Sequence, residues 1–331
     1  MSIPMLKILR KNFPRNHITL MCVRKNRDAF QHLSFLDEVM VFDRLRDFTS
    51  NLIKLFRNEY NIVLDLEPFR KVSSIVAFLS GAESRIGFDT NVRRKLYTHF
   101  VTYHNEKSYE SENMVRQLTV LDIIGPGNEA VDMGFDLPVP LNERVDALLQ
   151  SKGVEPKKDI LVAVAPGVLK PHHRWIMSRF AELVEMIRNE DFRTKILLIG
   201  SPSDLVDARK VLKHIDANER VISLVGETTF SEALAVLSNC KILIACDGGL
   251  VYMAAAMGCG TISLWGPGVM DRFKPPGENH IGIRKDYFCI PCVNYSRLGE
   301  FPPCPYNRRC YMDITAEEIF DQYLSLKAMS C

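Results

Sequence analysis

The chain has 331 residues, of which 47% are hydrophobic and 25% charged, and its formal net charge at pH 7 is only +2. This composition is that of a well-packed globular protein, which excludes a disordered chain and argues against a nucleic-acid partner. One hydrophobic core rarely grows beyond about 250–300 residues, so we expect two domains.

The start of the chain and its apolar runs bear on the compartment. Residues 1–7 lack the charged start and long apolar run of a signal peptide, and no later segment is apolar over a membrane-spanning length. We therefore expect a soluble, cytoplasmic protein. In that compartment the nine cysteines are expected to be reduced thiols or ligands rather than a disulfide framework.

In the first half, short β-branched runs alternate with amphipathic stretches. The predicted strands are 17–23, 38–42, 61–66 and 84–88, and the predicted helices are 48–59 and 70–79. Such alternation is typical of strand-helix-strand units with parallel sheets.

A passage rich in proline and glycine follows at residues 125–142. It includes Leu137-Pro138-Val139-Pro140, where we expect neither a helix nor a central strand. We place the interdomain linker here, which gives domains of residues 1–138 and 139–331.

The second half repeats the alternation more clearly. A helix is predicted at 143–152, strands at 160–165, 195–199, 221–224, 241–245 and 261–265, and a final helix at 316–326. The fold class is therefore α/β, with two successive Rossmann-like, doubly wound domains. Ligands of such sheets bind outside the carboxyl ends of the strands, which is where chemistry is to be sought.

The strongest motif lies where the predicted strand 241–245 ends. Asp247, Gly248 and Gly249 form a tight turn that leads into an alanine-rich helix. A helix that begins in this way points backbone N–H groups and its positive dipole end at the space above the strand, which suits a phosphate. The ordinary alternative is a capping aspartate with turn glycines.

A second motif follows the strand 160–165. Gly167 ends a Pro-Gly turn, and the loop after it carries Lys170, His172, His173 and Arg174. Cationic donors in one loop are suited to a diphosphate, whereas the alternative is a solvated basic loop.

Two further turns complete the same edge. Asp204 follows the strand 195–199 and offers a carboxylate to ribose hydroxyls, and Thr228 precedes a predicted helix. Helix capping explains both residues equally well. Gly266-Pro267-Gly268 closes the next strand in the same layer.

The order of these strand-end motifs is distinctive across the whole second half. They are Ala165-Pro166-Gly167 with Trp175 and Phe180, Leu198-Ile199-Gly200 with Asp204, residues 224–228, Asp247-Gly248-Gly249-Leu250, and Leu264-Trp265-Gly266-Pro267. The series resembles the family 9 glycosyltransferases, the ADP-heptose:lipopolysaccharide heptosyltransferases. The first half resembles the same family through residues 60–66, the helix 70–80 and residues 84–88.

The resemblance implies inverting transferases of the GT-B type, whose two Rossmann-like domains face each other across a cleft. The second domain would bind ADP-heptose or a related nucleotide-sugar through Gly167, Lys170, His173, Arg174, Asp204, Thr228, Asp247, Gly248, Gly249 and Tyr252. The first would bind the lipopolysaccharide core acceptor through Arg85, Arg93, Arg94 and Lys95, for which surface solubility is the alternative. No cofactor is implied, and contact with the inner membrane would be peripheral.

The resemblance also implies a general base that we do not find. Family members begin with a strand and a Gly-Asp turn whose aspartate is the expected base, and residues 3–14 resemble the segment after that turn. We therefore expect the first, central strand to be missing, its neighbours to have unpaired edges and turnover to be low. Asp65 and Glu67 are the obvious substitutes, although capping the turn before Pro68 is their ordinary role. No catalytic residue is assigned.

Smaller departures concern the donor. Gly248 stands where the family has Ser or Thr, Tyr252 where it has His, and His173 where it has Lys. Two alternatives therefore stay open beside the heptosyltransferase: an inactive nucleotide-binding homologue, and another sugar-nucleotide enzyme such as an epimerase.

Four cysteines cluster near the C-terminus. Cys289, Cys292, Cys304 and Cys310 are separated by two, eleven and five residues, a spacing that can enclose a tetrahedral zinc ion. Reduced or locally bridged thiols are the alternative, and we expect no catalytic metal.

Overall fold

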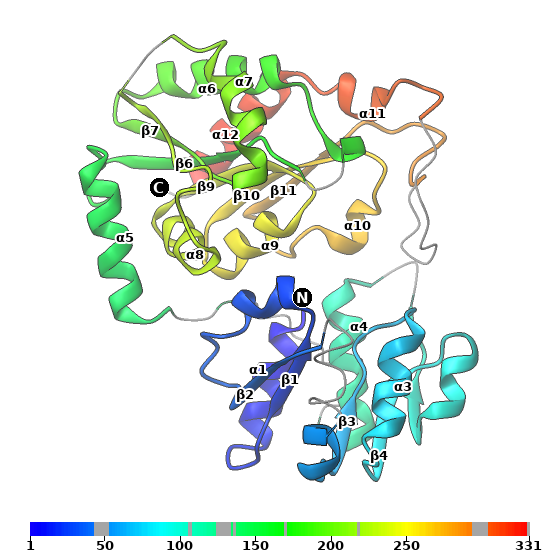
Figure 1. Ribbon diagram of the computed structural model, residues 1–331. Helices are drawn as coiled ribbons and strands as arrows, with labels where there is room; N and C mark the ends of the chain where they lie inside the picture. The colour runs from blue at the N-terminus through cyan, green and yellow to red at the C-terminus, as the bar shows by residue number, and fades with distance from the viewer. Residues whose placement is uncertain are drawn as a thin grey trace. The chain divides into compact units, whose positions relative to one another are not determined.

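The computed structural model describes residues 1–42, 53–104, 108–123, 134, 137–168, 171–216, 219–292 and 304–329. The chain divides into two compact units, Met1–Met133 and Gly134–Cys331 (Figure 1). This division falls a few residues before the boundary placed from the sequence.

The second unit is built on a sheet of six parallel strands. In chain order these are β6 (Ile160–Ala165), β7 (Thr194–Leu198), β8 (Val221–Ser223), β9 (Ile242–Cys246), β10 (Gly260–Trp265) and β11 (His280–Arg284). Their order across the sheet is β11-β10-β9-β6-β7-β8. Strands β6 to β8 are added toward one edge and β9 to β11 toward the other, so the order of strands reverses between β6 and β9. The five predicted strands are confirmed to within one residue, and β11 was not predicted.

Both faces of this sheet are covered. Helices α6 (Met177–Glu190), α7 (Leu205–Leu212) and α12 (Ala316–Met329) pack on one face, and α5 (Val139–Ser151), α8 (Phe230–Asn239) and α9 (Gly249–Ala256) on the other. Every residue of β9 and β10 is therefore buried. This burial explains why these strands read as continuous apolar runs.

The start of α5 corrects one expectation. The helix begins at Val139, inside the passage from which we excluded a helix, with Pro140 in its first turn. Proline is tolerated there because the first N–H groups of a helix have no intrahelical acceptor. The final helix likewise runs to Met329, a little beyond its predicted end.

The first unit contains two small parallel sheets. β1 (Thr19–Cys22) pairs with β2 (Glu38–Val41), and β3 (Ile62–Leu64), β4 (Ser84–Phe88) and β5 (His99–Val101) form the second sheet. Within the described ranges, no strand pairs with the second edge of β1 or of β3. The Tyr60 hydroxyl, just before β3, donates to Thr19 Oγ1 at 3.2 Å and links the two sheets.

Helices surround these strands. They are α1 (Ile3–Asn12), α3 (Lys71–Leu79) and α4 (Glu110–Arg116), together with the 3₁₀ helices η1 (Arg24–Ala29), η2 (Asn91–Leu96) and η3 (Gln117–Leu121). The predicted helix 70–79 is confirmed as α3. Residues 53–57 are helical, whereas the beginning of the predicted helix 48–59 lies outside the described residues.

Candidate functional site

The loops that follow β6 and β9 meet where the strand order of the second unit reverses. Asp247 directly follows β9, and its backbone N–H donates to the carbonyl of Leu264 at 2.9 Å, which fixes it at the end of the ladder. His173, in the loop after β6, places Nδ1 3.4 Å from Asp247 Oδ2. Both side chains are buried, and they join the two loops across the crevice in which doubly wound sheets bind ligands.

The second ring nitrogen of His173 is the atom of this pair that is left for a ligand. Nε2 is buried and has no hydrogen-bond partner among the described residues. A buried polar atom left unpaired costs about 1–3 kcal/mol, so it marks a position where a ligand atom or water belongs. Because Nδ1 faces Asp247 Oδ2, Nε2 is the ring nitrogen left for a ligand, and a phosphate bound there would accept a hydrogen bond from it.

The N-terminus of α9 lies beside this pair. No side-chain hydrogen bond caps the helix at Gly248. A Cβ atom built on Gly249 meets no atom within 4 Å, so the backbone there borders open space. Uncapped N–H groups and the positive end of the helix dipole favour an anion at this point.

Asp204 and Gly167 pack against each other at the same edge. A Cβ atom on Gly167 would lie 2.2 Å from Asp204 Cγ, so only glycine fits beside that carboxylate. Asp204 Oδ2 accepts from the backbone N–H of Ser201 at 2.8 Å and from its hydroxyl at 2.7 Å. The capping alternative therefore accounts for the contacts of Asp204, while its place beside the loop after β6 keeps it at the ligand edge.

The other cationic residues of the loop after β6 have surroundings that differ from those of His173. Arg174 Nη2 lies 2.9 Å from Asp207 Oδ2 on α7, so an ion pair already engages this guanidinium. Lys170 lies outside the described residues. Trp175 is buried and donates through Nε1 to the carbonyl of Ile314 at 3.1 Å. This contact fixes the loop that carries His173.

The remaining two donor candidates are half-buried. Thr229, and not Thr228, caps α8: its Oγ1 accepts from Glu232 N at 3.3 Å, and Glu232 Oε2 accepts from Thr229 N at 2.8 Å. Helix capping thus does not account for Thr228. Tyr252 lies in the first turns of α9, on the helix whose N-terminus borders the site.

One residue that shapes this edge was not predicted. A Cβ on Gly266 would lie 2.2 Å from the ring of Tyr311, which is fully buried and whose hydroxyl donates to Leu264 O at 3.3 Å. Burial raises the pKa of Tyr311 well above its ordinary value. No local sequence signal could have paired Tyr311 with a turn more than forty residues earlier.

The acceptor candidates of the first unit separate into two groups. Arg93 is fully buried, and its Nη2 donates to Asp65 Oδ2 at 2.6 Å and to Ser73 Oγ at 3.1 Å. This correction removes Arg93 from the candidates, because a charge paired inside the domain cannot reach an acceptor phosphate. Arg94 and Lys95 are exposed, which fits ligand contact and the surface-solubility alternative equally well.

Arg85 is the fourth acceptor candidate. It is the second residue of β4, at the amino end of the strand and away from the carboxyl edge. Its Nε donates to Leu96 O at 3.2 Å, and its guanidinium carbon lies 5.7 Å from the centroid of the Phe78 ring. Its surroundings are therefore those of α3 rather than of the ligand edge.

The carboxylates considered as substitute bases cap the turn after β3. Asp65 Oδ1 accepts from Glu67 N at 3.0 Å, and Glu67 Oε1 accepts from Phe69 N at 3.1 Å. The second oxygen of Asp65 is held by Arg93 and by the Tyr97 hydroxyl at 2.7 Å. Their ordinary role in the turn is thus confirmed.

The C-terminal cysteines are free thiols in the part of the chain that the structure describes. Burial, and after it the neighbouring cysteines, raises the pKa of Cys310 to about 11 and also raises that of Cys292. Among the described residues, no group of three or more potential ligands is placed to hold a metal ion. Zinc binding at these thiols stays a prediction.

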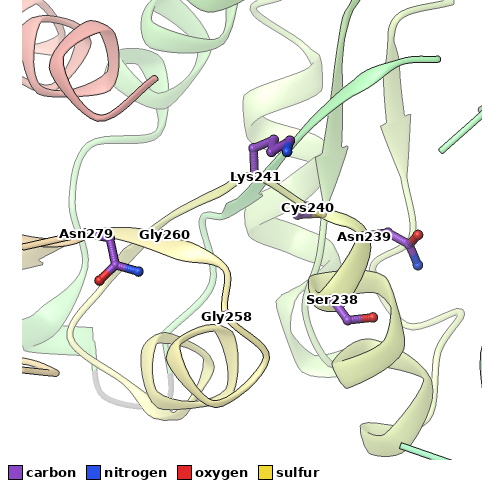
Figure 2. A pocket seen from close by; sticks show the side chains of 7 residues that line it. All are labelled: Ser238, Asn239, Cys240, Lys241, Gly258, Gly260 and Asn279. Carbon is purple, nitrogen blue, oxygen red and sulfur yellow. The ribbon is translucent and has the colours of Figure 1, made fainter. Parts of the chain in front are cut away.

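A hollow of about 260 Å³ lies at the opposite, amino edge of the sheet (Figure 2). Its lining residues are Ser238, Asn239, Cys240, Lys241, Gly258, Gly260 and Asn279. None of the candidate donor residues lines it, and its only ionisable groups are an exposed lysine and a buried thiol whose pKa burial raises to about 12. We therefore place the site at the carboxyl edge.

Of the helices described, none is both long and apolar enough to cross a bilayer.

Parallel strands in this order, with an open helix N-terminus at the point of reversal, are typical of doubly wound α/β proteins that bind nucleotides. Residues 50–300 match the model of glycosyltransferase family 9 (heptosyltransferase), and the chain belongs to this family.

Similar proteins agree with this assignment. The chain is 29% identical over 201 residues to lipopolysaccharide heptosyltransferase 2 of Salmonella typhimurium, a match that covers 58% of this chain and spans 56% of that relative's length. The fold is shared with the family 9 glycosyl transferase of Veillonella parvula (TM-score 0.79, 20% identity, 98% of this chain and 92% of that one). It is also shared with ADP-heptose heptosyltransferase II of E. coli (TM-score 0.76, 17% identity, 98% and 93%), so the architecture is of the GT-B type.

Proposed function

We propose that this protein transfers heptose from ADP-heptose, or a closely related nucleotide-sugar, to the inner core of lipopolysaccharide. The observation that carries the proposal is the His173–Asp247 pair beside the open N-terminus of α9. Membership of the family supports the reaction class, and the lipopolysaccharide heptosyltransferases among its relatives support the substrates.

The donor diphosphate would lie against the backbone of Gly248 and Gly249. The N–H groups of α9 would bind its oxygens, and His173 Nε2–H would donate a charge-assisted hydrogen bond. Thr228 and Asp204 would contact the nucleoside. Tyr252, Gly167 and the cations of the loop after β6 would complete the wall.

These contacts would act mainly on the leaving group. An acceptor hydroxyl would attack the anomeric carbon from the face opposite the diphosphate and give its proton to a general base or to water. The bond to the diphosphate breaks, and negative charge develops on ADP. Donors already in place at the α9 N-terminus stabilise that charge without reorganising. Arg94 and Lys95 would bind anionic groups of the acceptor at the cytoplasmic face of the inner membrane.

Calorimetric titration with ADP tests the donor site. Gly249→Val should weaken ADP binding by more than tenfold, about 1.4 kcal/mol, because a β-branched side chain fills the space into which the diphosphate fits. Lys241→Val, at the amino edge, is the matched control and should bind like the wild type. Unchanged affinity in folded Gly249→Val, or a loss confined to Lys241→Val, would place the nucleotide elsewhere.

Product analysis tests the reaction. Incubation with ADP-heptose and heptose-deficient lipopolysaccharide should release ADP and add the mass of one heptose to the acceptor. A nucleotide-binding homologue without turnover predicts the same ADP affinity and no product. An epimerase would instead change the sugar of the donor and leave the acceptor unaltered.

A further inference from the structure

The outer face of α3 is apolar where a helix exposed to water is ordinarily polar. Val72, Ile75 and Phe78 are 59%, 47% and 51% exposed, and at about 100° per residue they fall within an arc of about 120°. The other side of the helix is buried through Val76 and Ala77. Single exposed apolar side chains are common, but a row of three large ones on one helix marks an interaction surface.

Cations border this row. Lys71 is exposed and falls on the same arc of α3 as Phe78, and the guanidinium of Arg85 lies over the Phe78 ring. Residues 70–100 contain six arginines and lysines, of which Arg93 is buried and paired with Asp65, but only two carboxylates, Glu83 and Asp89. The remaining positive charge of the region therefore outweighs its negative charge.

The 3₁₀ helix η2 extends the same region. It packs against α3, and Arg93 of η2 donates to Ser73 of α3 at 3.1 Å. η2 adds exposed Arg94 and Lys95, of which Arg94 lies 3.7 Å from Asp89. We call the set Lys71, Val72, Ile75, Phe78 and Arg85 the α3 surface.

We propose that the α3 surface docks the first unit onto a lipid bilayer that contains anionic headgroups. Its apolar side chains would enter the interface, while the cations beside them bind lipid phosphates. The inference deepens the proposed function and rests on it for the partner, since a lipid-anchored acceptor is presented at a bilayer.

The position of α3 near the ligand edge of the sheet supports such a contact. The helix begins just after the turn that follows β3, at the carboxyl edge where parallel sheets bind ligands. The α3 surface extends from Lys71 at that edge to Phe78 and Arg85 at the amino end of β4, so docking would lay the whole length of α3 along the bilayer and bring the carboxyl edge to it. A second copy of the chain fits less well, because two α3 surfaces would bring like charges together.

Vesicle flotation tests the proposal with the full chain. We expect binding to phosphatidylcholine vesicles that contain about 30% phosphatidylglycerol, at least fivefold stronger than to phosphatidylcholine alone, as anionic lipid attracts each nearby cation. The double variant Ile75→Ser, Phe78→Ser should lower the partition coefficient by about tenfold or more. Lys71→Gln should lower it by about fivefold. The matched control is Phe192→Ser, a phenylalanine that is 83% exposed in the second unit, and it should bind like the wild type.

The changed side chains are exposed, so the variants should fold, and circular dichroism checks this. Failure of the wild-type chain to bind either vesicle, or unchanged binding by the double variant, would overturn the proposal. Another contradicting result would be a wild-type chain that does not bind vesicles but self-associates in analytical ultracentrifugation, with the self-association lost in the double variant. ADP affinity measured on the same samples tests the donor site separately, so either proposal can fail alone.

Discussion

At the scale of single residues, the buried charges of the first unit show what a sequence conceals. Arg93 stands between exposed neighbours in a basic run, and only the fold reveals that Asp65 and Tyr97 enclose it. Burial, together with the Asp65 charge, raises the pKa of Tyr97 far above its ordinary value, so Tyr97 stays a donor in this cluster. Removing one partner of such a group costs more than the pair contributes.

Gly87 gives a direct test of that cluster. A Cβ atom there would lie 2.3 Å from the Tyr97 ring, which cannot move aside because Asp65 and Arg93 hold its hydroxyl. We expect Gly87→Ala to lower the free energy of unfolding by about 1–3 kcal/mol. Urea denaturation measures this, with Gly249→Ala, whose Cβ meets open space, as the control. Equal stability of the two variants would show that the ring is not held.

Substitutions of His173 test whether its side chain contacts the second phosphate of ADP. His173→Gln should weaken ADP binding by about tenfold or more, the effect of one charge-assisted hydrogen bond, and should weaken AMP binding less, because AMP lacks the second phosphate. His173→Lys should restore most of the difference between the two nucleotides. Equal losses for ADP and AMP would indicate a merely structural histidine.

His280 gives a prediction about pH. It is buried beside Thr261, and burial, followed by the Lys274 charge, lowers the pKa of its imidazole to about 4. Between about pH 6.5 and 4 the unfolded chain therefore binds a proton that the folded chain refuses, so stability falls as the pH falls through this window. The contribution is on the order of 2 kcal/mol.

Urea denaturation at pH 7 and pH 4.5 measures that contribution. The loss of stability should be smaller in His280→Gln than in the wild type, because glutamine does not titrate. Carboxylates affect both proteins alike, so only the difference between them is informative. Parallel losses would show that His280 accepts its proton in the folded state.

At the scale of elements, buried strands were the easiest to predict, and the two strands that were missed both lie at sheet edges. β6, β9 and β10 are continuous apolar runs because helices cover both faces of their sheet. β5 and β11 lie at sheet edges, are short or carry polar residues at their ends, and gave no comparable pattern. The start of α5 was missed because Pro140 is compatible with a first turn but reads as a breaker.

The divided sheet of the first unit predicts uneven stability. β1 and β2 form a pair of four-residue strands in which only Met40 is fully buried, whereas β9 is buried throughout. Amides of the β1–β2 pair should exchange through an opening whose free energy is at least roughly 2 kcal/mol lower than that of the opening that exposes β9. Native-state hydrogen exchange resolved by mass spectrometry measures both. Equal protection would mean that the two sheets open as one with the second unit.

At the scale of the whole molecule, the sequence pointed to the carboxyl edge of the second unit as the place of the site, which stays a prediction, without revealing the geometry there. The strand-end turns could be read because parallel strands must bring their carboxyl ends together. The pairing of His173 with Asp247 could not, since it depends on which loops meet at the reversal of strand order. The ion pair between Arg174 and Asp207 could not be predicted for the same reason.

Hydrogen exchange in the presence and absence of ADP shows whether the nucleotide binds at the carboxyl edge of the second unit. If the diphosphate binds between the loop after β6 and the N-terminus of α9, ADP should slow exchange in peptides that cover residues 171–176 and 247–252. Peptides around residues 238–241 and 258–260, which line the hollow at the amino edge, should be unaffected. Protection at the amino edge, or none at residues 247–252 under saturating ADP, would contradict the account.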